Sequence, residues 1–266
     1  MTPDDAFIHG IPYPGVYVTD EDGRVIAKFF HDSYKKRDSP EIYIDAAMGE
    51  TLLNESAPTV CGGDENVKLT VAVHGGKGTV RQGIIRHLVV RFELPKGLHI
   101  YGPPVPEGMV HTEVKITGPA GFCAMTPELP PTKKLTMDIA ELNVWHGVVD
   151  FIYPFYATGD LASECRPLDQ PSIEISVQVR YQACTQNECL IPKTETFSLM
   201  VDLDVIDIPD IDVHRGHGQR SGNYDGTPAL IRLITRKAKQ NPVGVPLFIL
   251  KNLWLRLLSI TRKLKS

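Results

Sequence analysis

The feature that most constrains this chain is a pair of cysteines five positions apart, set between two runs in which apolar and polar residues alternate. The runs cover residues 172–181 and 193–203 and have the two-residue period of half-buried strands. The short polar segment between them predicts an antiparallel hairpin whose loop is residues 185–188. Cys184 and Cys189 close this loop. Opposed residues in such a ladder have Cα atoms about 4.5 to 5.5 Å apart, which a disulfide accepts.

Two interpretations of this pair are open. A structural disulfide would add little stability here, because the stabilisation from cross-linking grows with the length of the closed loop. Surface hairpins nevertheless do carry inert disulfides. A redox pair that opens and closes is the alternative, since a loop tip leaves sulfur accessible to a partner's thiolate. No Lys, Arg or His lies between the cysteines, and Arg180 and Lys193 flank the loop.

The sequence VRYQACTQNECLIPKTETFSL resembles the cysteine hairpin of the amino-terminal domain of DsbD-type thiol:disulfide interchange proteins. The likeness extends upstream through LPKGLHIYGPPVPEGMVHTEVKITGP and LNVWHGVVDFIYPF, and covers about residues 65–205. Such domains are immunoglobulin-like sandwiches that receive electrons from a membrane domain and reduce extracytoplasmic partners.

The resemblance implies that Cys184 and Cys189 are the catalytic pair of a thiol:disulfide oxidoreductase and that Cys189 is the attacking thiol. It implies thioredoxin-like redox proteins as partners, an extracytoplasmic (periplasmic) location, and no metal, flavin or nucleotide cofactor. The first residues, Met-Thr-Pro-Asp-Asp, lack a basic region followed by an apolar core, so they predict no signal peptide.

The middle of the chain has an all-β pattern. Short alternating runs are separated by turn signals such as Pro103-Pro104, Gly118-Pro119 and Pro130-Pro131. This spacing of strands indicates a β-sandwich. The predicted strands are residues 67–73, 84–94, 110–116, 134–139, 148–156, 172–181 and 194–203.

The first 50 residues resemble the carboxy-terminal part of a thioredoxin-like redoxin of the AhpC/TSA type. Residues 16–18 and 25–30 predict two strands joined by the turn residues 20–23, and Ser39-Pro40 predicts a helix start. Pro14 in IPYPGVYV matches the family's cis-proline. The segment lacks the redoxin's first strands, first helix and active cysteine, so we interpret it as a truncated gene model, a fragment or a degenerate domain that packs against its neighbour. We prefer the interpretation as a docking appendage and assign the segment no peroxidase activity.

Several residues outside the cysteine pair invite weaker interpretations. Trp145 is a candidate for an aromatic cap over the cysteines, expected within residues 130–146, or equally for a core residue of the next strand. His99 and His146 lie beside aromatic residues, and no ligand spacing joins them into a metal site. His214 and His217 form an H-x-x-H in a Gly-rich loop without a supporting Cys or carboxylate.

Three further cysteines, Cys61, Cys123 and Cys165, are scattered along the chain. Their spacing does not define a disulfide scaffold. We interpret them as buried or incidental thiols.

The C-terminal tail is basic. Residues 228–266 hold nine Lys or Arg and no Asp or Glu, which leaves 19 basic against 32 acidic residues, a net charge of −13, in residues 1–227. Residues 229–239 predict a short helix, and residues 247–265 predict a second one with a narrow polar stripe. Its apolar face and Trp254 suit the membrane surface, and the same face could instead pack on protein. We expect no nucleic-acid partner.

Together these patterns predict a mainly β protein with an immunoglobulin-like sandwich, a partial thioredoxin-like α/β segment before it and an amphipathic helical tail after it. The predicted function is thiol–disulfide exchange through Cys184 and Cys189. The alternative is a non-catalytic binding or assembly module with a structural disulfide, attached to a membrane or partner by its C-terminal helix. The predicted parts are residues 1–50 (redoxin segment), 51–66 (linker), 67–207 (sandwich), 208–227 (Gly-rich linker) and 228–266 (tail).

Overall fold

The computed structural model describes residues 15–31, 36–137, 140–210 and 225–263. The chain divides into two compact units, one formed by residues 1–158 with 171–203, the other by residues 159–170 with 204–266. The strands are β1 (Gly15–Thr19), β2 (Val25–Phe30), β3 (Arg37–Asp38), β4 (Thr59–Gly63), β5 (Lys68–His74), β6 (Ile84–Glu93), β7 (His99–Gly102), β8 (Glu113–Thr117), β9 (Phe122–Ala124), β10 (Lys133–Met137), β11 (Ala140–His146), β12 (Val148–Ala157), β13 (Ser172–Tyr181), β14 (Ala183–Cys184) and β15 (Lys193–Asp202). The helices are α1 (Pro40–Met48), the short 3₁₀ turn η1 (Gly76–Gly78), α2 (Gly159–Ala162), α3 (Thr227–Gln240) and α4 (Gly244–Lys263).

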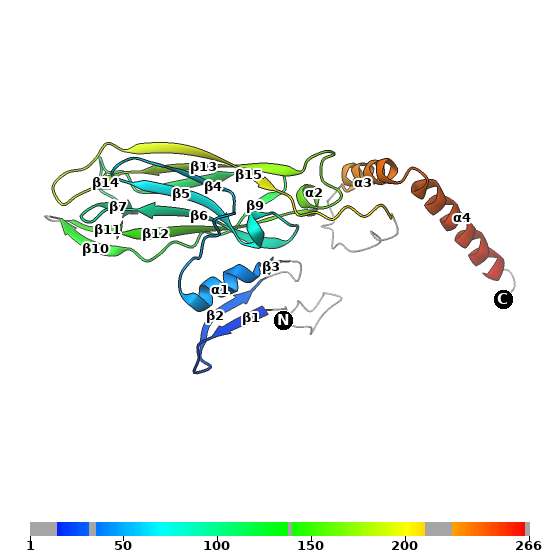
Figure 1. Ribbon diagram of the computed structural model, residues 1–266, viewed down its shortest axis with the longest axis horizontal. Coiled ribbons are helices and arrows are strands. Elements are labelled where there is room, and N and C mark those ends of the chain that lie inside the picture. Colours follow the sequence, from blue (N-terminus) through cyan, green and yellow to red (C-terminus); the bar gives the residue numbers. More distant parts are fainter. Residues whose placement is uncertain (1–14, 32–35, 138–139, 211–224, 264–266) are drawn as a thin grey trace. The chain divides into compact units, whose positions relative to one another are not determined.

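The first unit is built from layered sheets (Figure 1). One sheet has the order β4-β5-β6-β12-β9, with β3 joining β6 in parallel. A second has the order β15-β13-β8, and a third the order β10-β11-β7-β14. Apart from the β3–β6 pair, the ladders between the described strands are antiparallel. The prediction of a mainly β fold is confirmed.

The core lies between the sheets. On β13 every second residue is buried, as the alternation predicts. Phe92 of β6 contacts both Phe151 of β12 (ring centroids 5.2 Å apart) and Tyr181 of β13 (5.7 Å), so two sheets meet across this aromatic cluster. Burying a large apolar side chain of this kind contributes about 1.5 to 3 kcal/mol.

The N-terminal segment forms the predicted local elements. β1 and β2 pair as a hairpin, with Gly23 at φ 79° in the turn, and α1 follows Ser39. Nε2 of buried His74 lies 2.6 Å from a carboxylate oxygen of Asp45 of α1, and this contact ties the helix to β5. The redoxin resemblance itself stays a prediction, and Pro14 lies outside the described residues.

Sequence patterning missed several short strands. The interpretation of residues 51–66 as a linker is wrong for Thr59–Gly63, which form β4 at the edge of the six-stranded sheet. The strands β7 and β14 were also missed. Both are buried along their whole length, so their sequences show no alternation to detect.

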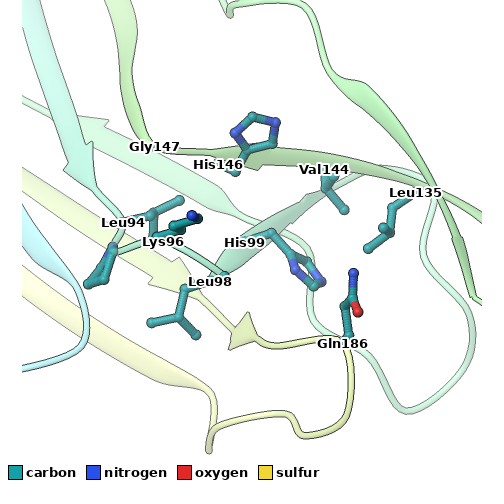
Figure 2. Close-up of a pocket in the computed structure, with 11 residues that line it drawn as sticks. Leu94, Lys96, Leu98, His99, Leu135, Val144, His146, Gly147 and Gln186 are labelled. Carbon is teal, nitrogen blue, oxygen red and sulfur yellow. The ribbon is translucent and has the colours of Figure 1, made fainter.

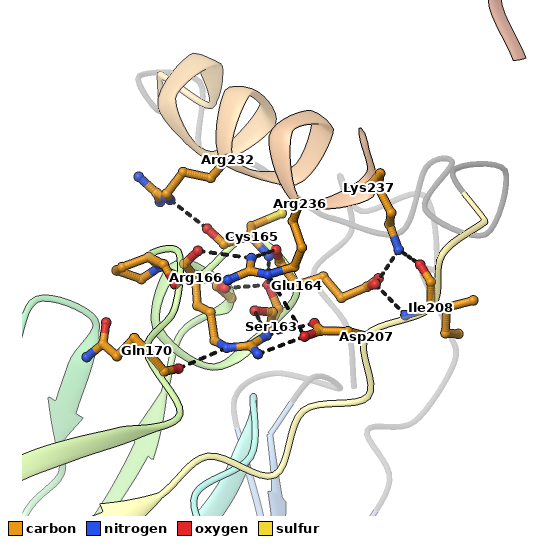
Figure 3. Close-up of polar contacts among 12 residues, drawn as sticks. Ser163, Glu164, Cys165, Arg166, Gln170, Asp207, Ile208, Arg232, Arg236 and Lys237 are labelled. Carbon is orange, nitrogen blue, oxygen red and sulfur yellow. Dashed lines mark hydrogen bonds and ion pairs between the residues drawn. The ribbon is translucent and has the colours of Figure 1, made fainter. Parts of the chain in front are cut away.

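The second unit contains α2, α3 and α4. Its interior is held by a polar network between α3 and the segments that precede it (Figure 3). Buried Lys237 bonds both the carboxylate of Glu164 and the carbonyl of Ile208. Arg166 makes a two-pronged ion pair with Asp207, with both N–O distances 2.8 Å. These hydrogen bonds hold the pKa of Asp207 below its usual range.

The C-terminal helices occur where they are predicted, with the break at residues 241–243. Many large apolar side chains of α4 are exposed, among them Leu250, Trp254 and Leu257. Among the described helices none is long and apolar enough to cross a membrane alone. Taken together, α3 and α4 have the length and apolar composition of a broken membrane span, with a bend of 113° between the two helices.

Candidate functional site

A disulfide joins Cys184 and Cys189 at the end of the long β13–β15 hairpin. The two Cα atoms lie 4.1 Å apart across an isolated antiparallel bridge. The loop between them is closed by a hydrogen bond from the Thr185 N–H to the Glu188 carbonyl (2.7 Å). The Thr185 hydroxyl also accepts hydrogen bonds from the N–H groups of Asn187 and Glu188, at 3.2 and 3.0 Å. The predicted hairpin with face-to-face cysteines is therefore present.

The chain changes sheets just before the first cysteine. Strand β13 ends at Tyr181, and β14 then pairs with β7 in a different sheet, with Ala183 opposite Ile100 and Cys184 opposite His99. The cysteine pair is thus held between two sheets. The alternation of residues along the hairpin does not predict this change of sheet.

The two sulfur-bearing residues differ in exposure. Cys184 is fully buried in a cluster with Tyr101, Leu142 and Val144, while Cys189 is exposed. Thiol–disulfide exchange requires that the attacking sulfur reach the sulfur it attacks. Cys189 is therefore the residue that a partner can approach, and Cys184 is shielded behind it.

Gln182 anchors the cysteine segment to its surroundings. Its side-chain oxygen accepts a hydrogen bond from the Val110 N–H (2.9 Å), and its amide donates to the Leu190 carbonyl (3.1 Å). Val110 belongs to the loop between β7 and β8, whose Val105 and Met109 pack against the cluster around Cys184. This loop therefore covers the buried cysteine.

Two polar side chains of β7 lie behind the exposed cysteine. The Tyr101 hydroxyl is 3.8 Å from the Cys189 sulfur and 3.2 Å from Nε2 of His99. Burial and the neighbouring His146 lower the pKa of the His99 imidazole. Burial raises the pKa of the Tyr101 hydroxyl. At neutral pH this pair is therefore an imidazole and a phenol without charge.

A pocket of about 560 Å³ lies beside the cysteine loop (Figure 2). Gln186 at the loop tip and His99 both contribute to its wall, together with Lys96 and His146. The rest of the wall is mainly apolar side chains from β10, β11 and the segment before β7, namely Leu94, Pro95, Leu98, Leu135 and Val144. The pocket gives solvent access to one end of the His99–Tyr101 pair.

Trp145 lies in the core rather than over the cysteines. Its ring packs on Phe151 at 4.7 Å, and its indole N–H donates to the Pro130 carbonyl (2.8 Å). Of the two interpretations of this residue, the structure supports the core residue of the next strand.

The other sequence candidates do not join the site. Within the described residues no cluster of three or more His, Cys, Asp or Glu could hold a metal ion. The motif of His214 and His217 lies outside the described residues. Lys193, which flanks the loop, forms an ion pair with Asp64.

The remaining cysteines are free thiols. Cys61 is exposed on β4, and Cys123 and Cys165 are half-buried. Of the two interpretations, buried or incidental, the exposed Cys61 is not a buried thiol.

Tyr101 is the site residue that sequence reasoning missed. It stands two positions after His99, so both side chains leave the same face of β7. That signal becomes readable only when β7 is known to pair with the cysteine strand.

The family model described as "Thiol:disulfide interchange protein DsbD, N-terminal" matches residues 78–201, just under half of the chain, and the match includes both bridged cysteines. No curated protein matches the chain.

Three solved structures show weaker likenesses. The N-terminal periplasmic domain of ScsB from Proteus mirabilis has a TM-score of 0.39 and 13% identity, covering 56% of this chain and 53% of that one. The reduced N-terminal domain of DsbD from Neisseria meningitidis has a TM-score of 0.30 and 17% identity, covering 43% and 77%. The complex between the DsbD and PilB N-terminal domains of the same organism gives 0.30 and 15%, covering 42% and 73%.

This chain therefore spans about half the length of the ScsB domain that it matches. The sequence match is what connects residues 78–201 with the thiol:disulfide interchange family.

Proposed function

We propose that the chain is a thiol–disulfide exchange module that passes electrons between protein partners through Cys184 and Cys189. The observation that carries the proposal is the unequal exposure of the bridged pair, with an accessible Cys189 at a loop tip and a buried Cys184 directly behind it. The match of residues 78–201 to a thiol:disulfide interchange family supports it.

The exchange begins from the reduced pair. The Cys189 thiolate attacks one sulfur of a partner disulfide, which forms a mixed disulfide and releases the partner's other sulfur as a thiolate. The Cys184 thiolate then attacks the Cys189 sulfur, closes the internal disulfide and releases the partner's second thiolate. Two electrons pass to the partner, whose two thiolates take up protons.

A purely structural role for the disulfide has little energetic basis here. The bridged residues are only five positions apart. A 15-residue loop closed by a disulfide gains about 3 kcal/mol of stability from the lost entropy of the unfolded chain, and this shorter loop gains less. The loop also keeps its own hydrogen bonds, including the one from the Leu190 N–H to the Ala183 carbonyl (2.9 Å).

The direct test is a trap with a purified thioredoxin that lacks its resolving cysteine and carries its remaining active-site cysteine as a mixed disulfide with thionitrobenzoate, which Cys189 displaces as the leaving thiolate. This thioredoxin represents the thioredoxin-like partners that the sequence resemblance implies. A Cys184→Ser variant retains the exposed Cys189 and cannot resolve the mixed disulfide, so a covalent adduct at Cys189 is expected. The matched Cys189→Ser variant keeps only the buried Cys184 of the pair and should trap much less, when adducts are assigned by peptide mapping so that the exposed free thiol of Cys61 is counted separately. Equal trapping by both variants, or by neither, would overturn the proposed roles.

The reduction potential of the pair separates exchange from a staple. Structural disulfides of secreted proteins lie below about −300 mV, and exchange pairs lie above it. We expect the Cys184–Cys189 pair to equilibrate with a dithiothreitol or glutathione redox buffer above that value. A pair that stays oxidised throughout the buffer range would support the alternative, a binding module with a structural disulfide.

The exposed apolar surface of α4 supports an attachment role for the tail. Trp254, Leu253 and Leu257 are exposed, and Lys251 and Arg256 supply positive charge on the same helix. We propose that residues 247–265 attach the exchange module to an anionic membrane surface. A protein partner for the same helix is the competing outcome, and the vesicle measurement described in the Discussion distinguishes them.

A further inference from the structure

The wall of the pocket beside the cysteine loop is mainly apolar. Its volume of about 560 Å³ lies within the range of about 300 to 1,000 Å³ that is typical of ligand sites, which are mostly apolar with a few polar groups. Half-buried Leu98 and Leu135 line it, together with buried Leu94 and Val144. The exchange of thiol and disulfide uses none of these apolar side chains, so the wall requires another explanation.

The pocket lies next to the sulfur that a partner has to reach. Gln186, three positions before Cys189, is part of the wall. The Cys189 sulfur is 3.8 Å from the Tyr101 hydroxyl, which is 3.2 Å from Nε2 of the wall residue His99. A mixed disulfide would hold the partner's cysteine at Cys189, and an extended chain advances about 3.3 Å per residue. A residue one to three positions from the partner's cysteine can therefore reach the pocket.

His99 gives the wall a polar group with spare hydrogen-bonding capacity. It is 5% exposed and lines the pocket, while Nε2 faces the Tyr101 hydroxyl and Nδ1 has no hydrogen-bond partner among the described residues. An occupant that displaces water from the pocket has to offer this nitrogen a partner.

A peptide backbone meets this requirement. It supplies both N–H donors and C=O acceptors, so it can pair with Nδ1 of His99 in either tautomer of the ring. The amide of Gln186, which Figure 2 shows turned toward His99, can bond the same backbone. These polar groups favour a peptide segment over a purely hydrocarbon ligand.

The charge of the wall excludes one kind of occupant. Lys96 is the only Lys, Arg, Asp or Glu among the 11 described residues that line the pocket. Burial and the neighbouring His146 lower the pKa of His99, so its imidazole is neutral at pH 7. A cationic side chain would lose its hydration here, find no carboxylate and be repelled by Lys96.

We propose that this pocket binds a large apolar side chain of the protein segment that presents its cysteine to Cys189. The inference rests on the proposed exchange function and names its substrate class. The preferred substrates are protein disulfides that have a leucine-like or aromatic residue, and no basic residue, at the matching position within three residues of the attacked cysteine. The apolar side chain fills the pocket, and the adjoining backbone bonds His99 and Gln186.

The test measures how fast Cys189 of the Cys184→Ser chain reacts with short glycine-based peptides. Each peptide carries one cysteine as a mixed disulfide with thionitrobenzoate, the leaving thiolate. One residue, placed one to three positions before or after that cysteine, is leucine, glutamine or lysine. Peptide mapping counts the adduct at Cys189 separately from that at the exposed Cys61. Leucine at the best position should raise the rate constant about tenfold over glutamine, and lysine should lower it below glutamine.

Two variants locate this preference in the pocket. Leu98→Gln and Leu135→Gln place polar side chains of similar size at half-buried wall positions. Each should reduce the preference for leucine to about twofold while the rate of the glutamine peptide stays nearly unchanged. The matched control is Ile191→Gln, which makes the same kind of change at an 83% exposed side chain two positions after Cys189 and outside the wall. It should keep the tenfold preference.

Three results would overturn the pocket. They are equal rates for leucine and glutamine at every position, a preference that survives both wall variants, and a preference that Ile191→Gln abolishes. The last would assign the contact to the exposed side chain beside the cysteine. Circular dichroism establishes folding, and if one wall variant does not fold, the other decides.

The pocket and the exchange function fail separately. Trapping of the thioredoxin by Cys184→Ser, with no preference for leucine among the peptides, would refute the pocket alone. A leucine preference without trapping would support the pocket and refute exchange with the thioredoxin class of partner.

Discussion

The side-chain oxygen of Gln182 accepts a hydrogen bond from the backbone N–H of Val110, 2.9 Å away, and so joins the cysteine segment to a loop 72 residues earlier in the chain. The amide of the same side chain donates to Leu190, just beyond the second cysteine. One buried glutamine thus fixes the entry and exit of the bridged loop and the loop that covers Cys184.

Replacing this glutamine should loosen the site. Gln182→Met keeps the volume and removes both hydrogen bonds, which leaves the Val110 N–H and the Leu190 carbonyl without them. We expect the unfolding free energy to fall by about 1 to 3 kcal/mol, measured as a lower urea midpoint with an unchanged slope. Gln186→Met at the exposed loop tip is the control and should change it by at most about 0.5 kcal/mol. An equal effect of both changes would contradict the anchoring role.

Buried His87 predicts acid sensitivity of the first unit. Burial, followed by the neighbouring His74, lowers the pKa of His87 to about 4, against about 6.5 in an unfolded chain. The unfolded state therefore binds a proton first as the pH falls, so the stabilisation is complete above pH 6.5 and is lost between 6.5 and 4. The loss amounts to roughly 3 kcal/mol.

Urea unfolding at pH 7.5, 6, 5 and 4.5 checks this sign. In His87→Leu the free energy of unfolding should fall less steeply over this pH range. His111→Gln, at an exposed position, should show the same fall as the unmodified chain. A decline of the same steepness in His87→Leu would assign the acid sensitivity to other groups.

The helical unit should depend on Lys237. Its ammonium group and the Glu164 carboxylate are 1% and 3% exposed, so removal of the lysine leaves a buried negative charge without its cation. Lys237→Met is expected to cost about 3 to 5 kcal/mol, seen as faster amide hydrogen exchange in α3.

The control for this change lies two residues away. Lys239 pairs with Asp169 at 3.6 Å while 60% exposed, so Lys239→Met should change the stability by less than about 1 kcal/mol. Equal exchange rates in the two variants would show that the buried pair does not hold the unit together.

Attachment through α4 can be followed with its own tryptophan. Trp254 is 63% exposed and Trp145 is 4% exposed, so vesicles of phosphatidylcholine with phosphatidylserine should shift mainly the Trp254 emission to shorter wavelength. Lys251→Gln combined with Arg256→Gln should weaken binding by about 2 kcal/mol, since each basic residue near such a surface contributes about 1 kcal/mol. No binding to either kind of vesicle would favour a protein partner for this helix, and equal binding to vesicles without phosphatidylserine would refute the contribution of the two basic residues.

The sequence predicts those parts of the fold that depend on neighbours along the chain. The alternation of Ile173 to Tyr181 predicts β13, the turn residues before Arg24 predict the first hairpin, and the cysteine spacing predicts a closed loop. Each of these is decided by side-chain periodicity or local turn chemistry.

The missed features depend on distant segments. Strand β7 has four consecutive buried residues and no periodic signal, and β14 has only two residues. The contact of Tyr101 with Cys189 joins positions 88 residues apart, so it follows from which strands pair and not from either sequence alone. The parallel pairing of β3 with β6 is missed for the same reason.

The two separate backbone ladders next to the cysteine loop have a consequence for turnover. Tyr181 remains paired within one sheet and Ala183 within another, and neither pairing uses the sulfur–sulfur bond. Cleavage of that bond would therefore leave both anchorages of the loop in place. The protein could be oxidised and reduced many times while its scaffold stays folded, so that only the tip needs to move.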